Sequence, residues 1–458
     1  MIDGFKRATA GRVTAASTVI AAGLLICATA TAAAGGEITV TTTTDELNVD
    51  GDCSLREALV AANTNSGVDD CAAGADGQDT IVLRPVTYRL TIPGRGEDAS
   101  ETGDLDVTES AQLIGGSSAG ARARVDAAGL DRVLDVRPGV AVGLFSLELV
   151  GGDAGPDEGG GLRLGDACGE ASDSTPANMS DMVVRGNEAS VGGGVHIDDC
   201  RTVDILWSSI IENHARETGG GVSAVGRSRV LVERSTFSGN SAGDAGGAWW
   251  ANSDGGDLAM LFSTVAGNRA PDGAGLWVTG TTFPANPMAT IMAANEGPNC
   301  GGVHPFGINL LSDDLSCGPQ SGLAPGVEVQ LDALTMVDGH WVHPPLAGSP
   351  AIDLVSGSEC DQARSDQTGA VRPQDGDGDG FARCDVGAYE VRAAAAPAPS
   401  GVPNSATTRA TGGTLVVTVG GVALLVVSAL MVSLIPGPLR PPLLVPRPGR
   451  GRTRNPPG

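Results

Sequence analysis

Residues 183–197 read VVRGNEASVGGGVHI, and the same pattern returns as IIENHARETGGGVSAV from Ile210, FSGNSAGDAGGAWWA from Phe237, VAGNRAPDGAGLWV from Val265 and MAANEG from Met292. Each copy holds one asparagine, and these are 26 to 28 residues apart: Asn187, Asn213, Asn240, Asn268 and Asn295. A period in the high twenties without helical heptads is typical of a solenoid, in which each repeat forms one coil. We expect the asparagines to stack as a structural amide ladder.

Short stretches of alternating apolar and polar residues between the asparagines predict β-strands a few residues long. Stacked strands lie about 4.8 Å apart, so residues one repeat apart lie on top of each other. The aliphatic ladders predicted for the interior are Val203–Val230–Leu258 and Ile205–Val232–Met260. The chain is therefore predicted to be an all-β protein, a right-handed parallel β-helix of roughly ten coils over residues 79–350.

Both ends of such a solenoid need caps, because an exposed end presents unpaired strand edges. Ser54-Leu55-Arg56-Glu57 is a capping box that starts a helix. One face of that helix is apolar and consists of Leu55, Ala58, Leu59 and Ala62. We expect this N-terminal capping helix, within residues 35–78, to cover the first coil. Residues 351–392 are expected to form the C-terminal cap.

Three segments also resemble a known family. CSLREALVAAN from Cys53 is similar to the N-terminal CSLREA motif of bacterial surface β-helix proteins, and SPAIDLVSGSEC from Ser349, DQTGAVRP from Asp366 and CDVGAYE from Cys384 resemble their choice-of-anchor Q region. The repeats resemble the FxxN and GGA repeats of polymorphic outer membrane proteins, best at residues 237–240 and 246–248. The resemblance covers about residues 37–390. It implies a right-handed parallel β-helix displayed on the cell surface and no agreed biochemical activity.

Both termini have features of export and anchoring. Basic residues precede an apolar run, and small residues lie near the end of that run. Residues 1–34 are therefore predicted to be a secretory signal peptide. Residues 413–435 carry no charge and are long enough to cross a bilayer as one transmembrane helix. Five arginines follow in residues 436–458, which the positive-inside rule places in the cytoplasm. Residues 393–412 are predicted to be a flexible linker, with the body on the extracellular side of the plasma membrane.

The charge and the cysteines both fit an exported protein. The formal net charge is −25, and every acidic residue except Asp3 lies within residues 35–412, so no nucleic-acid partner is expected. Once the signal is removed, eight cysteines remain, and an even number in an exported chain favours disulfides. Their order suggests four local bridges: Cys53–Cys71, Cys168–Cys200, Cys300–Cys317 and Cys360–Cys384.

One acidic loop has the spacing of a calcium site. Asp375, Asp377 and Asp379 alternate with glycines, as in loops that surround Ca²⁺ with oxygen ligands. The glutamate expected at the twelfth position is missing, because Val386 stands there. A structural Ca²⁺ ion in the C-terminal cap is one interpretation, and a flexible acidic loop is the other.

Three tryptophans fall in two successive coils: Trp249, Trp250 and Trp277. Aromatic faces stack on sugar rings and anchor protein interfaces, so these residues are candidates for ligand binding. Neighbouring residues on a strand face opposite sides, so at least one of Trp249 and Trp250 is expected to face outward. The alternative is that one tryptophan fills the interior and another shields a loop.

Catalysis has weaker support. Asp198 and Asp199, with Asp204 on a neighbouring strand, are the best local candidates for a carboxylate pair that cleaves polysaccharide. Cys200 makes this segment resemble a bridged loop instead. We therefore expect a cell-surface protein that binds extracellular carbohydrate or protein without catalysis. A carbohydrate-active lyase or hydrolase is the alternative, and a passive spacer is the third hypothesis.

Overall fold

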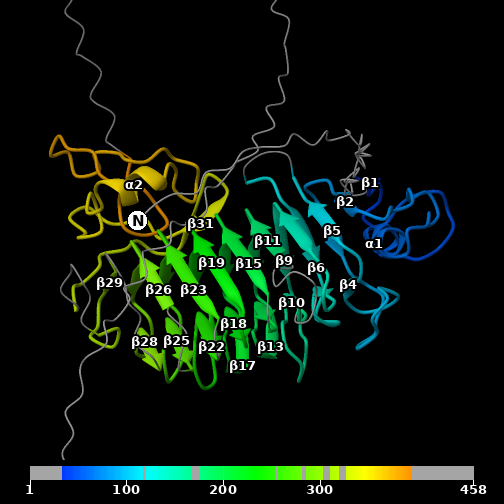
Figure 1. Ribbon diagram of the computed structural model, residues 1–458, viewed down its shortest axis with the longest axis horizontal. Helices are drawn as coiled ribbons and strands as arrows, with labels where there is room; N and C mark the ends of the chain where they lie inside the picture. Colours follow the sequence, from blue (N-terminus) through cyan, green and yellow to red (C-terminus); the bar gives the residue numbers. More distant parts are fainter. Residues whose placement is uncertain are drawn as a thin grey trace, which may run out of the picture. The chain divides into compact units, whose positions relative to one another are not determined.

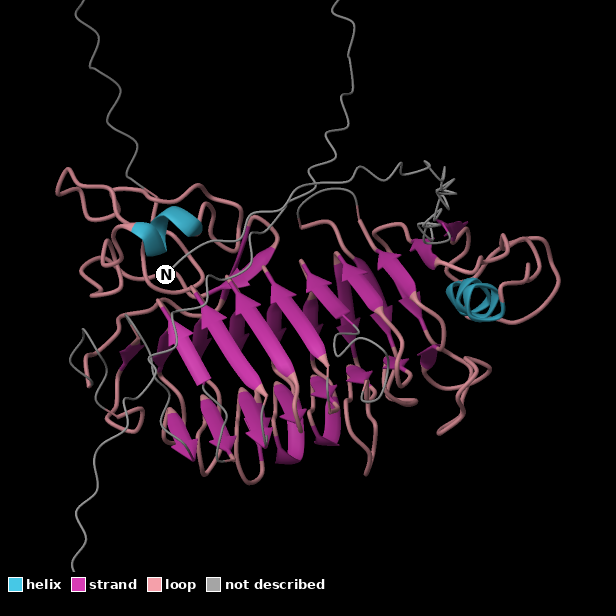
Figure 2. Ribbon diagram, in the orientation of Figure 1, coloured by secondary structure: helices cyan, strands magenta, loops and turns pink. Residues whose placement is uncertain are grey.

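The computed structural model is an all-β parallel solenoid (Figure 1), which confirms this part of the predicted fold class. The structure describes residues 34–116, 120–167, 176–199, 201–252, 256–280, 285–302, 310–318 and 326–392. Successive coils each place one short strand in each of three long parallel sheets. Figure 2 shows the strands of neighbouring coils side by side.

Two of the three sheets contain nine strands among the described residues. Sheet 1 has the order β1 (Ala34–Thr39), β2 (Gln78–Val82), β5 (Ala111–Ile114), β8 (Val142–Phe145), β11 (Pro176–Ser180), β15 (Thr202–Leu206), β19 (Arg229–Glu233), β23 (Asp257–Leu261) and β26 (Ala285–Met288). Sheet 2 has the order β3 (Thr87–Arg89), β6 (Ala123–Asp126), β9 (Leu147–Val150), β12 (Val183–Arg185), β16 (Ser209–Ile211), β20 (Thr236–Ser238), β24 (Thr264–Ala266), β27 (Ile291–Ala293) and β29 (Leu311–Ser312).

The third sheet follows sheet 2 along each coil. Its eight described strands are β4 (Leu105–Val107), β7 (Leu134–Val136), β10 (Leu162–Leu164), β14 (Val195–Ile197), β18 (Val222–Val225), β22 (Trp249–Asn252), β25 (Leu276–Thr279) and β28 (Cys300–Gly302). A short additional sheet lies between sheets 2 and 3 in chain order and consists of β13 (Glu188–Val191), β17 (His214–Thr218) and β21 (Ser241–Ala242). The three long sheets end at β26, β29 and β28, well before residue 350, where the sequence places the end of the β-helix.

The interior ladders predicted from the repeat are confirmed. The paired positions of sheet 1 are Val203 with Val230 and Leu258, and Ile205 with Val232 and Met260. None of these six side chains is more than 2% exposed. Because full burial of an aliphatic side chain contributes about 1.5–3 kcal/mol, such ladders are a main source of the stability of the coils.

The repeat asparagines form the expected amide ladder. Asn187 Nδ2 donates to Asn213 Oδ1 at 3.0 Å, and the same bond joins each following pair as far as Asn295 at 2.9–3.0 Å. Each amide nitrogen also donates to a carbonyl of the preceding coil, as Asn240 does to Ile210 O at 2.8 Å. A buried amide whose donors and acceptors are satisfied stabilises its turn, so the role of these residues is structural.

Helix α1 (Leu55–Thr64) lies at the end of the coils where the described chain begins (Figure 1). Its capping box is present, because the Ser54 hydroxyl accepts from Glu57 N at 3.1 Å and Glu57 Oε2 accepts from Ser54 N at 2.9 Å. The apolar face of α1 is buried against β1, β2 and β4. The N-terminal capping helix predicted from the sequence is therefore confirmed.

Arg56, in the first turn of this helix, is fully buried. Its Nε donates to Asp45 Oδ1 at 2.7 Å. Its remaining donors reach the carbonyls of Ser100, Gly103 and Asp104 at 2.9–3.1 Å. Arg56 thus fastens the loop between β3 and β4 to the capping helix.

The last described segment covers a flank of the coils. It contains the antiparallel hairpin β30 (Thr335–Val337) and β31 (His340–Val342) and the short helix α2 (Ser358–Gln362). Gln367 Nε2 donates to Ser209 Oγ at 2.8 Å, and Ala388 N donates to Thr264 Oγ1 at 3.0 Å. Since Ser209 and Thr264 belong to β16 and β24, residues 326–392 cover the outer face of sheet 2.

Three of the predicted disulfides are present: Cys53–Cys71, Cys300–Cys317 and Cys360–Cys384. Cys168 and Cys200 lie outside the described residues, as do nearly all of the predicted signal peptide, the linker, the predicted transmembrane helix 413–435 and the tail. Within the described ranges, neither α1 nor α2 is long and apolar enough to cross a membrane.

Candidate functional site

The outer face of sheet 3 carries one polar or aromatic side chain per coil. In the strands from β4 to β25, two apolar residues point inward and the residue between them points outward. The outward row, in register from strand to strand, is Asp106, Asp135, Arg163, His196, Ser223, Trp250 and Trp277. At about 4.8 Å per strand the row spans about 29 Å. It is charged at one end and aromatic at the other.

The three candidate tryptophans divide between the two sides of sheet 3. Trp249 is 1% exposed, and its ring packs edge-to-face on Phe237 with a centroid distance of 6.0 Å. It belongs to the core, so the prediction that Trp249 contacts a ligand is corrected. Trp250 and Trp277 are half-buried outward residues whose Cα atoms are direct partners on β22 and β25. Only this pair can take part in a binding surface.

The middle of the row is closed to solvent. His196 is 4% exposed and Ser223 is fully buried, although both lie on the outward side of their strands. His196 Nε2 lies 3.2 Å from Asp198 Oδ1. Asp106 and Asp135 are also buried, so the partly exposed side chains of the row are Arg163, Trp250 and Trp277.

A polar cavity of about 220 Å³ lies at the charged end. Seven carboxylates and only three guanidinium groups line it. They come from the loop between β3 and β4, from the turns beside β7 and β10, and from these strands themselves. The excess of carboxylates gives the cavity a negative potential, which favours cationic or neutral ligands over anionic ones.

Asp135 is the centre of the ion pairs in this cavity. Its carboxylate oxygens lie 3.3 Å from Arg132 Nη1, 3.1 Å from Arg137 Nη1 and 3.2 Å from Arg163 Nη1. Arg137 also reaches Asp98 at 2.7 Å. Three guanidinium groups therefore balance and orient a single buried carboxylate.

Asp104 and Asp106 are less well compensated. Burial, together with the charges of Asp106 and Asp131 and against that of Arg132, raises the pKa of Asp104 to about 8. Burial also raises the pKa of Asp106 to about 7, although a hydrogen bond from Ser100 N lowers it. Asp106 Oδ1 has no hydrogen-bond partner among the described residues, and Asp106 is fully buried.

The carboxylates selected from the sequence as catalytic do not come together as a pair. Asp198 is held by His196 and Arg163, and these two contacts lower its pKa although burial raises it. Asp199 accepts a hydrogen bond from Arg227 N in the following coil. Asp204 lies on β15 in sheet 1, where burial and then the charge of Glu233 raise its pKa. Asp198 thus follows β14 of sheet 3, whereas Asp204 lies within sheet 1.

Two of the three predicted calcium ligands, Asp375 and Asp377, lie together, but Asp379 is not part of their group. Carboxylate oxygens of Asp375 and Asp377 lie within 4.8 Å of one another and of Asp353, which is buried. Asp379 instead pairs with Arg383 at 3.5 Å. The third carboxylate of the group is therefore Asp353, which the loop spacing alone could not reveal.

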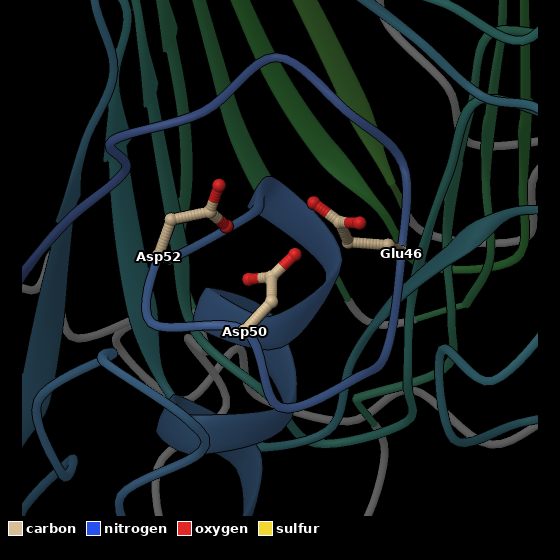
Figure 3. A group of neighbouring side chains, drawn as sticks. All are labelled: Glu46, Asp50 and Asp52. Atoms are coloured by element: carbon tan, nitrogen blue, oxygen red, sulfur yellow. The ribbon is translucent and has the colours of Figure 1, made fainter.

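A second acidic group lies beside the capping helix. Glu46, Asp50 and Asp52 have carboxylate oxygens within 4.8 Å of one another. Figure 3 shows the three side chains pointing into the loop that precedes α1. Desolvation and the charges of Asp50 and Asp52 raise the pKa of Glu46.

The carboxylates in and beside the cavity were not predicted, although the sequence contains a signal for Asp106 and Asp135. Leu105-Asp106-Val107 and Leu134-Asp135-Val136 repeat the same tripeptide. In a strand, a charged residue between two inward aliphatic residues must point outward. What the pattern could not show is that the loop between β3 and β4 folds over these side chains to form a cavity.

Comparison of the chain with protein-family models, curated proteins and solved structures finds no match. A solenoid shape by itself is compatible with many functions. The outer face of sheet 3 therefore offers the best indication of function.

Proposed function

We propose that this chain is a cell-surface protein that binds extracellular carbohydrate on the outer face of sheet 3. The observation that carries the proposal is the pair Trp250 and Trp277, two outward and partly exposed indoles in register on adjacent strands. Indole faces provide apolar area for sugar rings, while their N–H groups remain available to hydroxyls. A polymer can bind along such a sheet, because side chains repeat at the strand spacing.

Glycines beside Trp277 leave the space that its ring occupies on the surface of sheet 3. Gly301 is the partner of Trp277 on β28, and a Cβ atom at Gly301 would lie 2.1 Å from Cε3 of the tryptophan ring. The ring of Trp277 therefore extends over Gly301 in space that only glycine leaves free. A Cβ atom at Gly273 would similarly lie 2.9 Å from Trp277 Cβ.

Family and location are part of the same proposal. The motifs at residues 53–63 and 366–390 support membership of the CSLREA-motif surface proteins with a right-handed β-helix. A signal peptide and a C-terminal membrane helix would place the body outside the cell. Several polar residues of these motifs are buried, including Arg56 and Gln367, so the motifs build the fold. We therefore place the ligand-binding surface outside these motifs.

A carbohydrate-active enzyme is the second candidate, and one observation favours it. Asp104, with a pKa of about 8, lines the same cavity as Asp135, which is paired with three arginines. A protonated carboxyl group and a charged carboxylate in one cleft are the elements of general acid–base cleavage of a glycosidic bond. If turnover occurs, we assign it to this cavity.

We retain Ca²⁺ as a proposed structural ion of the C-terminal segment, with Asp353, Asp375 and Asp377 as its carboxylates. The support is the proximity of their oxygen atoms, which are the ligands that Ca²⁺ prefers. There the ion would join the loop around Asp377 to the residues that precede α2.

The binding proposal is tested with a panel of polysaccharides and the purified full-length chain, by affinity electrophoresis and by assay of released oligosaccharides. The double variant Trp250→Ala/Trp277→Ala is expected to weaken binding about tenfold or more, which corresponds to about 1.4 kcal/mol. Trp207→Ala is the matched control, because Trp207 is a partly exposed tryptophan at another turn, where Arg234 stacks on it. Equal binding by the double variant and the wild type would contradict the proposal. Release of oligosaccharides would instead favour the enzyme.

A further inference from the structure

The charged end of sheet 3 contains more negative charge than its own arginines balance. Asp135 forms ion pairs with three arginines. Asp106 is its direct partner on the adjacent strand β4, and no described ion pair joins Asp106 to an arginine. Like charges directly opposite each other on neighbouring strands are destabilising. A compensating positive charge beside Asp106 would remove this repulsion.

We propose that Asp98, Asp106 and Asp135 bind one divalent cation of the oxygen-preferring class, with Ca²⁺ as the probe ion, at the edge of the cavity that Asp98 and Asp135 line. One carboxylate oxygen from each residue lies within 4.8 Å of the others. Carboxylate oxygens suit Ca²⁺, Mg²⁺ and Mn²⁺. The site is separate from the acidic loop at Asp375 and from the group at Glu46.

The second observation is an unsatisfied acceptor. Asp106 is fully buried, and its Oδ2 accepts from Ser100 N at 2.8 Å. Its Oδ1 has no hydrogen-bond partner among the described residues. Leaving a buried polar atom unsatisfied costs about 1–3 kcal/mol, and a cation bound by Asp106 would give this oxygen a partner.

Arg137 shows how the site is held together. Its Nη1 lies 2.7 Å from Asp98 and 3.1 Å from Asp135, so the guanidinium keeps two of the three carboxylates adjacent. No described hydrogen bond joins Arg137 to Asp106. The arginine therefore holds Asp98 close to Asp135 and leaves Asp106 without a cationic partner among the described contacts.

The three ligands come from different parts of the fold. Asp98 belongs to the loop between β3 and β4, Asp106 lies on β4, and Asp135 lies on β7 of the next coil. Binding would therefore fasten the loop that covers the cavity to two stacked strands. We expect the cation to protect this loop from proteolysis as well as to raise stability.

The test uses isothermal titration calorimetry with CaCl₂ on the full-length chain after treatment with a chelator. A background variant, Asp52→Asn/Asp375→Asn, first removes a carboxylate from each of the other acidic groups. We expect the background variant to bind one Ca²⁺ and Asp106→Asn in that background to lose it. Asp98→Asn changes an exposed loop residue without touching a strand, and it should weaken the same binding event about tenfold or more.

Glu109→Gln is the matched control, because it removes an exposed negative charge just beyond β4, outside the group. It should leave Ca²⁺ binding unchanged. Circular dichroism and the midpoint of urea unfolding identify any variant that fails to fold. The proposal is overturned if the background variant binds no Ca²⁺, or if Asp98→Asn and Asp106→Asn both bind it as the background variant does.

Discussion

Gln367 Nε2 donates to Ser209 Oγ at 2.8 Å across 158 residues of sequence. Thr236 Oγ1 donates to Oε1 of the same amide at 2.6 Å. All three residues are buried, so one side chain joins the C-terminal segment to two adjacent coils. The outer face of sheet 2 is thereby occupied by the chain itself, and an external ligand has to use another face.

The first prediction concerns this amide. Gln367→Ala should lower the free energy of unfolding by about 1–3 kcal/mol, because the hydroxyl groups of Ser209 and Thr236 each lose a buried hydrogen bond. The midpoint of urea unfolding measures the effect. Gln362→Ala is the control, since Gln362 is an exposed glutamine of α2. An equal, small change in both variants would show that the buried amide contributes nothing specific.

The second prediction concerns Arg56. Lysine keeps the charge but cannot reproduce the fork that reaches Asp45 and the carbonyls of the loop between β3 and β4. We expect Arg56→Lys to destabilise the protein by about 1–3 kcal/mol, because buried carbonyl groups lose their donors. Arg89→Lys, at a pair whose arginine side chain is 62% exposed, should change stability by about 1 kcal/mol or less.

Limited proteolysis separates two explanations of that loss. Since Arg56 holds the carbonyls of Ser100 and Gly103, its replacement should expose the loop between β3 and β4 to cleavage before the coils unfold. A variant that is destabilised as much but cleaved at other sites first would show that Arg56 acts on the helix and not on the loop.

The coils could be predicted because the sequence pattern that specifies them is periodic. Each residue of the ladders at Val203 and Ile205 has the same neighbour one repeat later, so the repeat length alone fixes the pairing. The capping box at Ser54 is equally local. By contrast, Gln367 and Ser209 are joined by a single long-range contact, and no repeat or spacing indicates that the C-terminal segment lies along sheet 2.

The candidate site was only partly predictable for the same reason. Alternation along β22 required one of Trp249 and Trp250 to face outward, but the interior contact with Phe237 decides which. The cavity depends on a loop between β3 and β4 that has no periodic pattern. The conformation of this loop depends on hydrogen bonds from Arg56 to Gly103 and from Arg137 to Asp98. These partners are far apart in the sequence and meet only in the folded chain.

The third prediction concerns the centre of the amide ladder. Asn240→Ala removes donors to Asn268 and Ile210 and the acceptor that Asn213 uses. We expect a loss of about 2–4 kcal/mol, since several buried partners become unsatisfied together. Asn286→Ala, an exposed position on β26, serves as the comparison. If the two variants unfold at the same urea concentration, the ladder is not a source of stability.

The last prediction is a dependence of stability on pH. In the folded protein the pKa of Asp104 is about 8 and that of Asp106 about 7, whereas aspartate in an unfolded chain has a pKa of about 4. Between about pH 4 and pH 8 the folded state therefore binds more protons than the unfolded state. The free energy of unfolding should consequently fall as the pH rises through this window.

Urea unfolding with a chelator present, at pH 5 and at pH 8.5, measures the change. Asparagine keeps the shape of the side chain but cannot ionise. The free energy of unfolding of Asp104→Asn should therefore fall by about 1–3 kcal/mol less than that of the wild type between the two pH values. Asp244→Asn, at an exposed position, should retain the wild-type dependence. Because the high negative charge of the chain also disfavours the compact state at high pH, the difference between the variants is the decisive quantity. Identical pH dependences in wild type and Asp104→Asn would mean that Asp104 is already ionised at pH 5 in the folded protein.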